Sequence, residues 1–511
     1  MSINVHPFGL PCLRCLNDIK GTSFIDVSKS VLTSKISRPT DITRLIVGEA
    51  GSGKTMLLLS HPFASLAKER GIVEVGVHPE TAGIVTFSKA LKAFPGGRRA
   101  EAWEQLWRLA TFRAIATHMI CGIRFQLIED EVNAIRPLVD HFQKTEVPIG
   151  VSVSLSHICS QISTRNEFKE KVNSPDFHSA VNAIVEILRR TDPFYILLDV
   201  SDEVLDNAPV AWSECLQGLL FFVLGSKSDT NFERVRIVAT STARVHRAAM
   251  RQPRYSNYTG RADVLHLKWF PADARGFLNA KIAELPDELV IIPQIDDPKR
   301  LAKKWLGVAS LKNRSSGRQE KVLDYLIRHT RCTPRQLIIL GNQISILVRN
   351  AKSTSKKRVA SADISRLVHS YVPEFAKNMM MDLSSELVLR GIAQDFDRSP
   401  MNVYEGSNED IVGSSQNLEK FFQRLAKTGL HLSQLKNEIE THITNGDSES
   451  VEILNLLWQR HFFGLEIVQR GRRSKTMNYA NDQEFPPWNA AADLPIRFHS
   501  LIDNYSRLSL A

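Results

Sequence analysis

The sequence predicts an α/β protein built around a parallel β-sheet, with further helical domains toward its C-terminus. A short apolar run at 44–47 leads into a glycine-rich loop and then into an apolar helical pattern. A second apolar run at 194–199 ends in a carboxylate and follows the turn signal Asp192-Pro193. Helical patterns fill most of the chain between these runs. Strands that alternate with helices are typical of a parallel sheet.

The loop between the first strand and its helix, Gly48–Thr55, has the sequence GEAGSGKT and matches the P-loop pattern G-x-x-x-x-G-K-[S/T] throughout. Its glycines let backbone N–H groups turn toward a polyphosphate, and the following helix N-terminus adds positive potential. We expect Lys54 to reach the β- and γ-phosphates and Thr55 to ligate Mg²⁺. The sequence thus predicts nucleoside triphosphate binding by Gly48, Gly51, Ser52, Gly53, Lys54, Thr55 and Met56.

Hydrolysis also needs acidic groups beside the metal and the attacking water, and the second strand supplies them. Asp199, at the end of that strand, is the predicted partner of Mg²⁺. Glu203, with Asp202 as the second candidate, is predicted to polarise the water. The alternative for Asp202 and Glu203 is helix capping at a strand-to-helix turn.

Two further positions are candidates for sensing the nucleotide. The strand at 234–239 leads into Thr240-Ser241-Thr242, where Thr242 is the predicted contact to phosphate or water and ordinary turn residues are the alternative. Thr333 and Pro334 are typical of a helix start. Arg335, which follows them, either folds over the nucleotide or faces solvent.

Bulk properties limit the class of protein. At 511 residues the chain is long enough for three or four domains, and 43% hydrophobic with 23% charged residues is ordinary for a soluble protein. No apolar run reaches the roughly 18–20 residues of a membrane span, and no secretion signal is visible. The six cysteines are scattered, which favours a cytoplasmic protein. A net charge of +10 permits nucleic-acid binding.

The pattern of helices and linkers predicts five segments. A helical insertion at about 98–190, whose clearest amphipathic run is 101–125, accounts for the 145 positions between Lys54 and Asp199. A stretch rich in Asn, Ser, Gly and acids is the predicted linker. The segments are an N-terminal segment 1–42, a P-loop core 43–290, a helical lid and connector 291–398, the linker 399–415 and a C-terminal domain 416–511.

The C-terminal domain has the pattern of a winged helix. Three helical patterns, at 418–427, 432–443 and 451–462, precede two predicted strands at 464–469 and 476–479. Such a module can place a helix in the major groove of double-stranded DNA while its wing holds backbone phosphates. Protein docking is the alternative. The candidate phosphate contacts at the hairpin tip are Arg470, Arg472, Arg473 and Lys475.

Taken together, these motifs resemble the AAA+ and STAND region of P-loop ATPases, most specifically bacterial relatives of the ORC/Cdc6 origin-recognition ATPases. The matching stretches are 51–58, 199–203 and 333–337. The resemblance implies a P-loop NTPase sheet with a helical lid and a C-terminal winged helix, with Arg335 as a second sensor. It also implies a homo-oligomer in which a neighbouring subunit donates an arginine finger, with Arg244, Arg247, Arg251 and Arg254 as the candidates.

These features predict a cytoplasmic Mg²⁺-dependent ATPase that acts as a nucleotide-driven switch or assembly factor on DNA. ATP is favoured over GTP by the resemblance and by the lack of an Asn-Lys-x-Asp signature. The first alternative is a STAND-type signalling ATPase, as in bacterial defence, whose C-terminal domain binds protein. The second is a nucleotide-binding scaffold with hardly any turnover. No effector motif stands out, so we expect output activity to belong to another chain.

Overall fold

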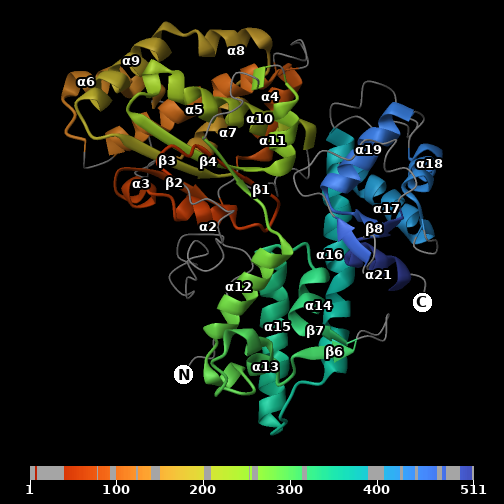
Figure 1. Cartoon of the computed structure of the whole chain (residues 1–511). Helices are drawn as coiled ribbons and strands as arrows, with labels where there is room; N and C mark the ends of the chain where they lie inside the picture. Colours follow the sequence, from red (N-terminus) through yellow and green to blue (C-terminus); the bar gives the residue numbers. More distant parts are fainter. Residues whose placement is uncertain are drawn as a thin grey trace. The chain divides into compact units, whose positions relative to one another are not determined.

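The computed structural model forms two compact units (Figure 1), one of residues 12–268 and one of residues 1–11 with 269–511. The boundary at Lys268 precedes the predicted end of the core at 290. The structure describes residues 6–8, 40–76, 79–91, 99–121, 125–139, 150–200, 209–252, 254–255, 263–312, 319–389, 408–425, 430–443, 447–468, 475–478 and 495–508.

A five-stranded, all-parallel sheet organises the first unit, which is therefore α/β as predicted. Its strand order is β2-β3-β4-β1-β5, so β4 lies between β1 and β3. Because the strands are parallel, their carboxyl ends share one edge of the sheet. The strands are β1 (Leu45–Gly48), β2 (Gly71–Val75), β3 (Phe194–Asp199), β4 (Val235–Thr242) and β5 (Val264–Leu267).

Burial explains why β3 was recognisable in the sequence and β2 was not. β3 is covered on both faces, so Phe194 to Leu198 form a continuous apolar run, as buried parallel strands do. β2 has Glu74 in its interior, which interrupts that pattern. The carboxylate of Glu74 is only 5% exposed and accepts hydrogen bonds from the backbone N–H and hydroxyl of Ser152. Burial raises the pKa of Glu74.

Helices cover both faces of the sheet (Figure 1), with α2 and α3 on one side and α10 with α5 on the other. Among the described residues between β2 and β3 there are six α-helices, of which α5 to α9 lie in the region of the predicted insertion. The helices of this unit are α2 (Lys54–Leu59), α3 (Ala64–Arg70), α4 (Thr81–Leu91), α5 (Arg99–Cys121), α6 (Glu129–Ile135), α7 (Val151–Ser160), α8 (Arg165–Val172), α9 (Pro175–Arg189), α10 (Pro209–Gly225) and α11 (Ala243–Met250).

The amphipathic helix predicted at 101–125 forms α5, but only its first turns have a solvent-facing side, where Glu101 and Gln105 are exposed. From 109 to 117 the helix is buried all round, and Trp103 and Trp107 are fully buried. Trp107 donates from Nε1 to the carbonyl of Cys215 on α10 at 2.8 Å. A helix that is apolar all round belongs inside a core. The residues between β2 and β3 therefore share one hydrophobic core with the sheet.

The second unit begins with a helical region. Phe8 packs against Trp305, with ring centroids 5.1 Å apart, and its N–H donates to Asn342 Oδ1 at 2.8 Å. Part of the predicted N-terminal segment therefore belongs to this unit. Its elements are α12 (Pro271–Ala283), α13 (Leu301–Leu306), β6 (Ser310–Lys312), β7 (Gln319–Lys321), α14 (Val322–Arg328), α15 (Pro334–Ser353) and α16 (Ser361–Leu389).

The C-terminal part contains the expected helices and hairpin. Its strands form an antiparallel sheet of order β10-β8-β9. α17 begins at Asn408, so residues 408–415 of the predicted linker are helical instead. The elements are α17 (Asn408–Leu425), α18 (Leu432–His442), α19 (Asp447–Gln459), β8 (Phe463–Val468), β9 (Lys475–Asn478), β10 (Ile496–Phe498) and α21 (Ser500–Leu508).

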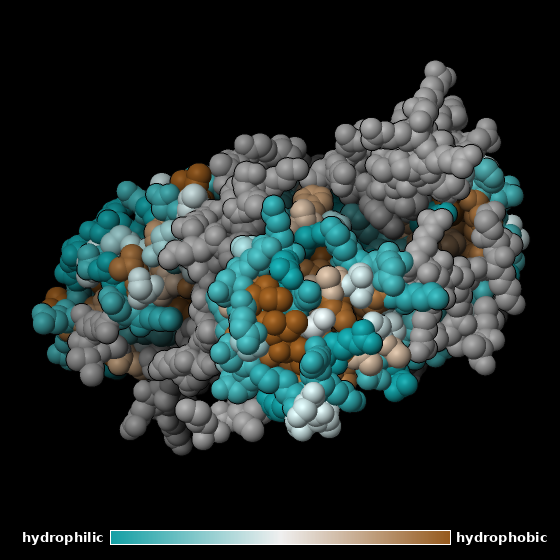
Figure 2. Space-filling model, turned by 60° about the horizontal axis from the view of Figure 1, so that its bottom comes forward, coloured by the Kyte–Doolittle hydropathy of each residue, from teal (hydrophilic) through white to brown (hydrophobic). Residues whose placement is uncertain are grey.

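The surface in Figure 2 is mostly hydrophilic, with small groups of apolar residues set among polar ones. Among the described residues, no helix is both long and apolar enough to cross a membrane.

A buried ion pair joins the C-terminal helices to α16. Arg460 donates from Nε and Nη2 to Oε2 of Glu386, at 3.0 and 2.5 Å. The side chains are 3% and 4% exposed. Removing one member of such a pair leaves the other charge buried without compensation.

We predict that Glu386→Ala lowers the free energy of unfolding of this unit by about 3–5 kcal/mol. Denaturant unfolding followed by tryptophan fluorescence measures the change. The matched control is Asp363→Ala, which breaks the exposed pair with Arg366 (44% and 77% exposed) and should cost less than about 1 kcal/mol. Equal losses in both variants would contradict the prediction.

Candidate functional site

The loop Gly48–Thr55 connects β1 to α2 at the carboxyl edge of the sheet. Gly51 and Gly53 have φ angles of 73° and 97°, in the left-handed region that favours glycine. Gly53 is the N-cap of α2, which begins at Lys54, two residues before the predicted helix start at Met56. A Cβ at Gly48 would lie 2.5 Å from Oγ of Ser52, because Ser52 is tucked under the loop. Of the two fixed glycines of the pattern, Gly53 is thus favoured by its backbone conformation and Gly48 by the closeness of Ser52.

Lys54 folds back over this loop. Its Nζ donates to the carbonyl oxygens of Gly48 and Glu49, each at 3.2 Å. The ammonium group is therefore held against the backbone of the loop.

Asp199, at the end of β3, receives a hydrogen bond on each carboxylate oxygen. Oγ1 of Thr55 donates to Oδ2 at 2.5 Å, and Oγ1 of Thr240 donates to Oδ1 at 2.6 Å. The donors come from α2 and β4, which meet here because β4 separates β1 from β3. The predicted metal residues Thr55 and Asp199 are thus in direct contact, although 144 positions separate them in the chain.

Thr240, rather than Thr242, makes the side-chain contact to this acid. Leu198 pairs with Ala239 in the β3–β4 register, which places Thr240 level with Asp199. The hydroxyl of Thr242 instead accepts from the N–H of Val245 at 3.4 Å and caps α11. The run of three hydroxyl residues that ends β4 was the available signal, but only the register distinguishes Thr240 from Thr242.

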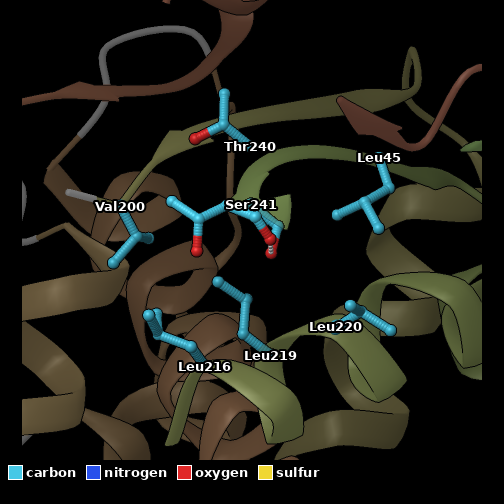
Figure 3. Close-up of a pocket in the computed structure, with 8 residues that line it drawn as sticks. Leu45, Val200, Leu216, Leu219, Leu220, Thr240 and Ser241 are labelled. Atoms are coloured by element: carbon cyan, nitrogen blue, oxygen red, sulfur yellow. Dashed lines mark hydrogen bonds between the residues drawn. The ribbon is translucent and has the colours of Figure 1, made fainter. Parts of the chain in front are cut away.

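A small cavity lies on the α10 side of these strands (Figure 3), where Ser241 and the leucines of α10 face one another. Its volume is about 10 Å³, which is at the lower limit for one water molecule. It is too small for a nucleotide and is not the binding site. Its lining residues are Leu45, Val200, Leu216, Leu219, Leu220, Thr240, Ser241 and Thr242.

The helix after β4 is anchored beside the loop. His246 of α11 is 2% exposed and shares a 2.7 Å hydrogen bond with the hydroxyl of Tyr255. Burial, with His266 and Arg247 adding to it, lowers the pKa of His246 to about 4. This imidazole is therefore neutral at physiological pH and acts as a structural contact.

The arginines predicted as finger candidates have different environments. Arg254 pairs with Glu104 of α5 at 2.5 Å and lies over the ring of Phe221. Arg247 faces Glu49 of the loop at 3.5 Å. Arg244 is buried, whereas Arg251 is exposed. Arg247 and Arg254 thus form ion pairs within their own unit.

The other predicted site residues belong to the second unit or lie outside the described residues. Arg335 is half-buried in the first turn of α15, in the second unit, and Thr333 occupies the N-cap position without a side-chain cap bond. Lys475 begins β9. The remaining predicted residues lie outside the described part of the chain and stay predictions: Asp202, Glu203, Arg470, Arg472 and Arg473.

The donor chemistry fits a hard cation that also binds a ligand. Among the described residues, no group of three His, Cys, Asp or Glu side chains could hold a metal alone. One carboxylate and one hydroxyl, as at Asp199 and Thr55, match the way Mg²⁺ is held together with substrate phosphates.

Comparison with known proteins found no matching protein-family model and no significant match to a curated protein.

We predict that Gly53→Ala lowers the free energy of unfolding of the first unit by about 1–2 kcal/mol, because an L-residue is strained at φ 97°. No atom lies within 4 Å of the added Cβ, so the cost is conformational alone. Gly225→Ala, at a right-handed φ of −71°, is the control and carries no such cost. Denaturant unfolding compares the two, and equal stabilities would contradict this explanation.

Proposed function

We propose that the chain is a Mg²⁺-dependent ATPase that acts as a nucleotide-driven switch or assembly factor. The observation that carries the proposal is the contact of Thr55 with Asp199 at the carboxyl edge of the sheet, directly beside a loop with P-loop sequence. The coincidence of both features supports nucleotide binding more strongly than the motif alone.

Each of these side chains has a distinct role in the proposal. Lys54 would neutralise the β- and γ-phosphates, and Thr55 with Asp199 would hold Mg²⁺, which offsets charge on the transferring phosphoryl group. Thr240 fixes the orientation of the Asp199 carboxylate through its hydrogen bond. Glu203, with Asp202 as the alternative, would accept the proton of the attacking water.

Phosphate-dependent contacts are the basis of the proposed switch. The terminal phosphate would hold the loop, the sensor residues and Arg335 of the helical lid, and its removal would release them. A parallel sheet followed by a helical region supports this AAA+ or STAND-like organisation, with homo-oligomer formation and an effector on another chain as further parts of the proposal.

DNA is the first candidate partner of the C-terminal domain. Three helices followed by an antiparallel sheet support a winged helix, and the sequence between β8 and β9 contains several arginines. A basic wing would neutralise DNA phosphates and make binding dependent on salt.

One observation favours protein docking as the second candidate. α19, the third helix of the domain, has three acidic residues and no basic one. Its apolar residues are mostly buried, and Arg460 just beyond it is committed to the ion pair with Glu386. An acidic helix is repelled by DNA phosphates, so a STAND-type signalling ATPase that binds protein is the alternative function.

We predict that Lys54→Ala and Asp199→Asn each reduce ATP turnover by about 100-fold or more, because each removes charge stabilisation at the phosphates. Glu203→Gln should lose most turnover and retain ATP binding. Phosphate release and equilibrium ATP binding measure the two properties separately.

The matched control for the acidic residues is Glu186→Gln on α9. The carboxylate of Glu186 is exposed and pairs with Arg189 of the same helix. The variant should leave turnover unchanged. Wild-type turnover that survives Lys54→Ala would exclude this site as its source. Turnover unaffected by Glu203→Gln would favour a scaffold with a different water-activating group or none.

For the partner, we predict that Arg472→Glu with Arg473→Glu abolishes retention of double-stranded DNA and leaves ATP binding unchanged. Electrophoretic mobility at low and moderate salt measures retention, since contacts to phosphate weaken with salt. DNA binding that is unchanged in the variant, or absent in the wild type, would favour the protein-docking alternative.

A further inference from the structure

An ion pair connects the phosphate-binding loop to the helix after β4. Nη1 of Arg247, on α11, lies 3.5 Å from Oε1 of Glu49, the second residue of the loop. The side chains are 25% and 32% exposed, so the pair is reached by solvent. Glu49 occupies a variable position of the P-loop pattern, and the pattern alone assigns it no role.

The backbone of Arg247 is fixed beside the loop by its neighbours. Gly48 and Thr242 lie opposite each other in the β1–β4 register, and α11 starts at the next residue. His246, which precedes Arg247, is anchored by its hydrogen bond to Tyr255. The long arginine side chain can therefore change partner while its helix stays in place.

Glu49 also lies next to the lysine of the loop. Nζ of Lys54 donates to the carbonyl oxygen of Glu49 at 3.2 Å. The group expected to reach the β- and γ-phosphates and the carboxylate that holds Arg247 thus belong to the same part of the loop. A phosphate seated there would compete with Glu49 for the guanidinium.

We propose that Arg247 contacts the terminal phosphate and distinguishes a nucleoside triphosphate from a diphosphate, while Glu49 holds its guanidinium when that phosphate is missing. This inference rests on the function proposed above, because it requires phosphates in the loop. Arg247 acts here within its own chain, unlike the arginine finger that the resemblance implies.

Geometry and charge favour the exchange. The 3.5 Å separation from Glu49 exceeds the roughly 2.7–2.9 Å of a good charge-assisted hydrogen bond, and exposed ion pairs of this kind are weak. A phosphate group carries about −1.5 to −2 charges and three acceptor oxygens, and arginine can bind it bidentately. Binding of the triphosphate would therefore replace a weak contact with a stronger one.

The test is equilibrium binding of fluorescent ADP and of a fluorescent, non-hydrolysable ATP analogue to the full chain with Mg²⁺. Arg247→Ala should weaken binding of the ATP analogue about tenfold, or about 1.4 kcal/mol, and binding of ADP less than about twofold. Glu49→Gln should tighten binding of the ATP analogue severalfold, because the guanidinium is released. Arg247→Lys should lose part of the preference for the ATP analogue over ADP, because lysine keeps the positive charge but cannot donate the two parallel hydrogen bonds of a guanidinium.

Arg189→Ala is the matched control. It breaks an exposed pair with Glu186 on α9 and should bind both nucleotides like the wild type. Thermal unfolding of each variant checks that folding is intact.

The inference is overturned if Arg247→Ala weakens the binding of both nucleotides equally or weakens the binding of neither. If Lys54→Ala abolishes binding in the same series, the proposed nucleotide site survives that result. A wild-type protein that binds neither nucleotide overturns both proposals.

Discussion

The carboxylate of Asp199 is held from two sides, by the hydroxyl of Thr55 and by that of Thr240. These hydrogen bonds connect the first helix after the glycine loop, the strand β3 and the strand β4. The strand order β2-β3-β4-β1-β5 makes the contacts geometrically feasible, because it brings the ends of β3 and β1 to either side of β4. The proposed ATPase chemistry, including the role of Arg247, depends on this shared edge.

Local sequence patterns predicted the elements at this edge of the sheet whose residue types are set by their backbone conformation or burial. The loop, the helix α2 after it and the strand ending in Asp199 follow from glycine conformation and from continuous apolar runs. What could not be predicted depends on contacts between distant segments. β2 was missed because Glu74 interrupts its apolar pattern, and the contact made by Thr240 follows from strand register alone. The ion pair of Glu49 with Arg247 joins the loop to α11, and no local sequence pattern relates these two segments.

Contacts between distant segments also explain where the structure differs from the sequence-based predictions outside the site. The amphipathic pattern of the first turns of α5 did not indicate that residues 109–117 are buried all round, where the helix packs against both α7 and α10. In the C-terminal domain the helices and the hairpin were predictable from local patterns, whereas the commitment of Arg460 to Glu386 was not. In the proposed function, that pair removes a basic side chain from the set that could contact DNA. Whether the proposed partner is DNA or a protein therefore depends on the basic residues between β8 and β9.

The central claim is that Thr55 and Asp199 hold a divalent cation together with the phosphates of a nucleotide. Electron paramagnetic resonance of Mn²⁺, used in place of Mg²⁺, tests it directly in the full chain. The account predicts that Mn²⁺ binds tightly only when ATP is present and that Asp199→Asn abolishes this ATP-dependent binding. Mn²⁺ binding that is independent of ATP, or that is unchanged in Asp199→Asn, would contradict it.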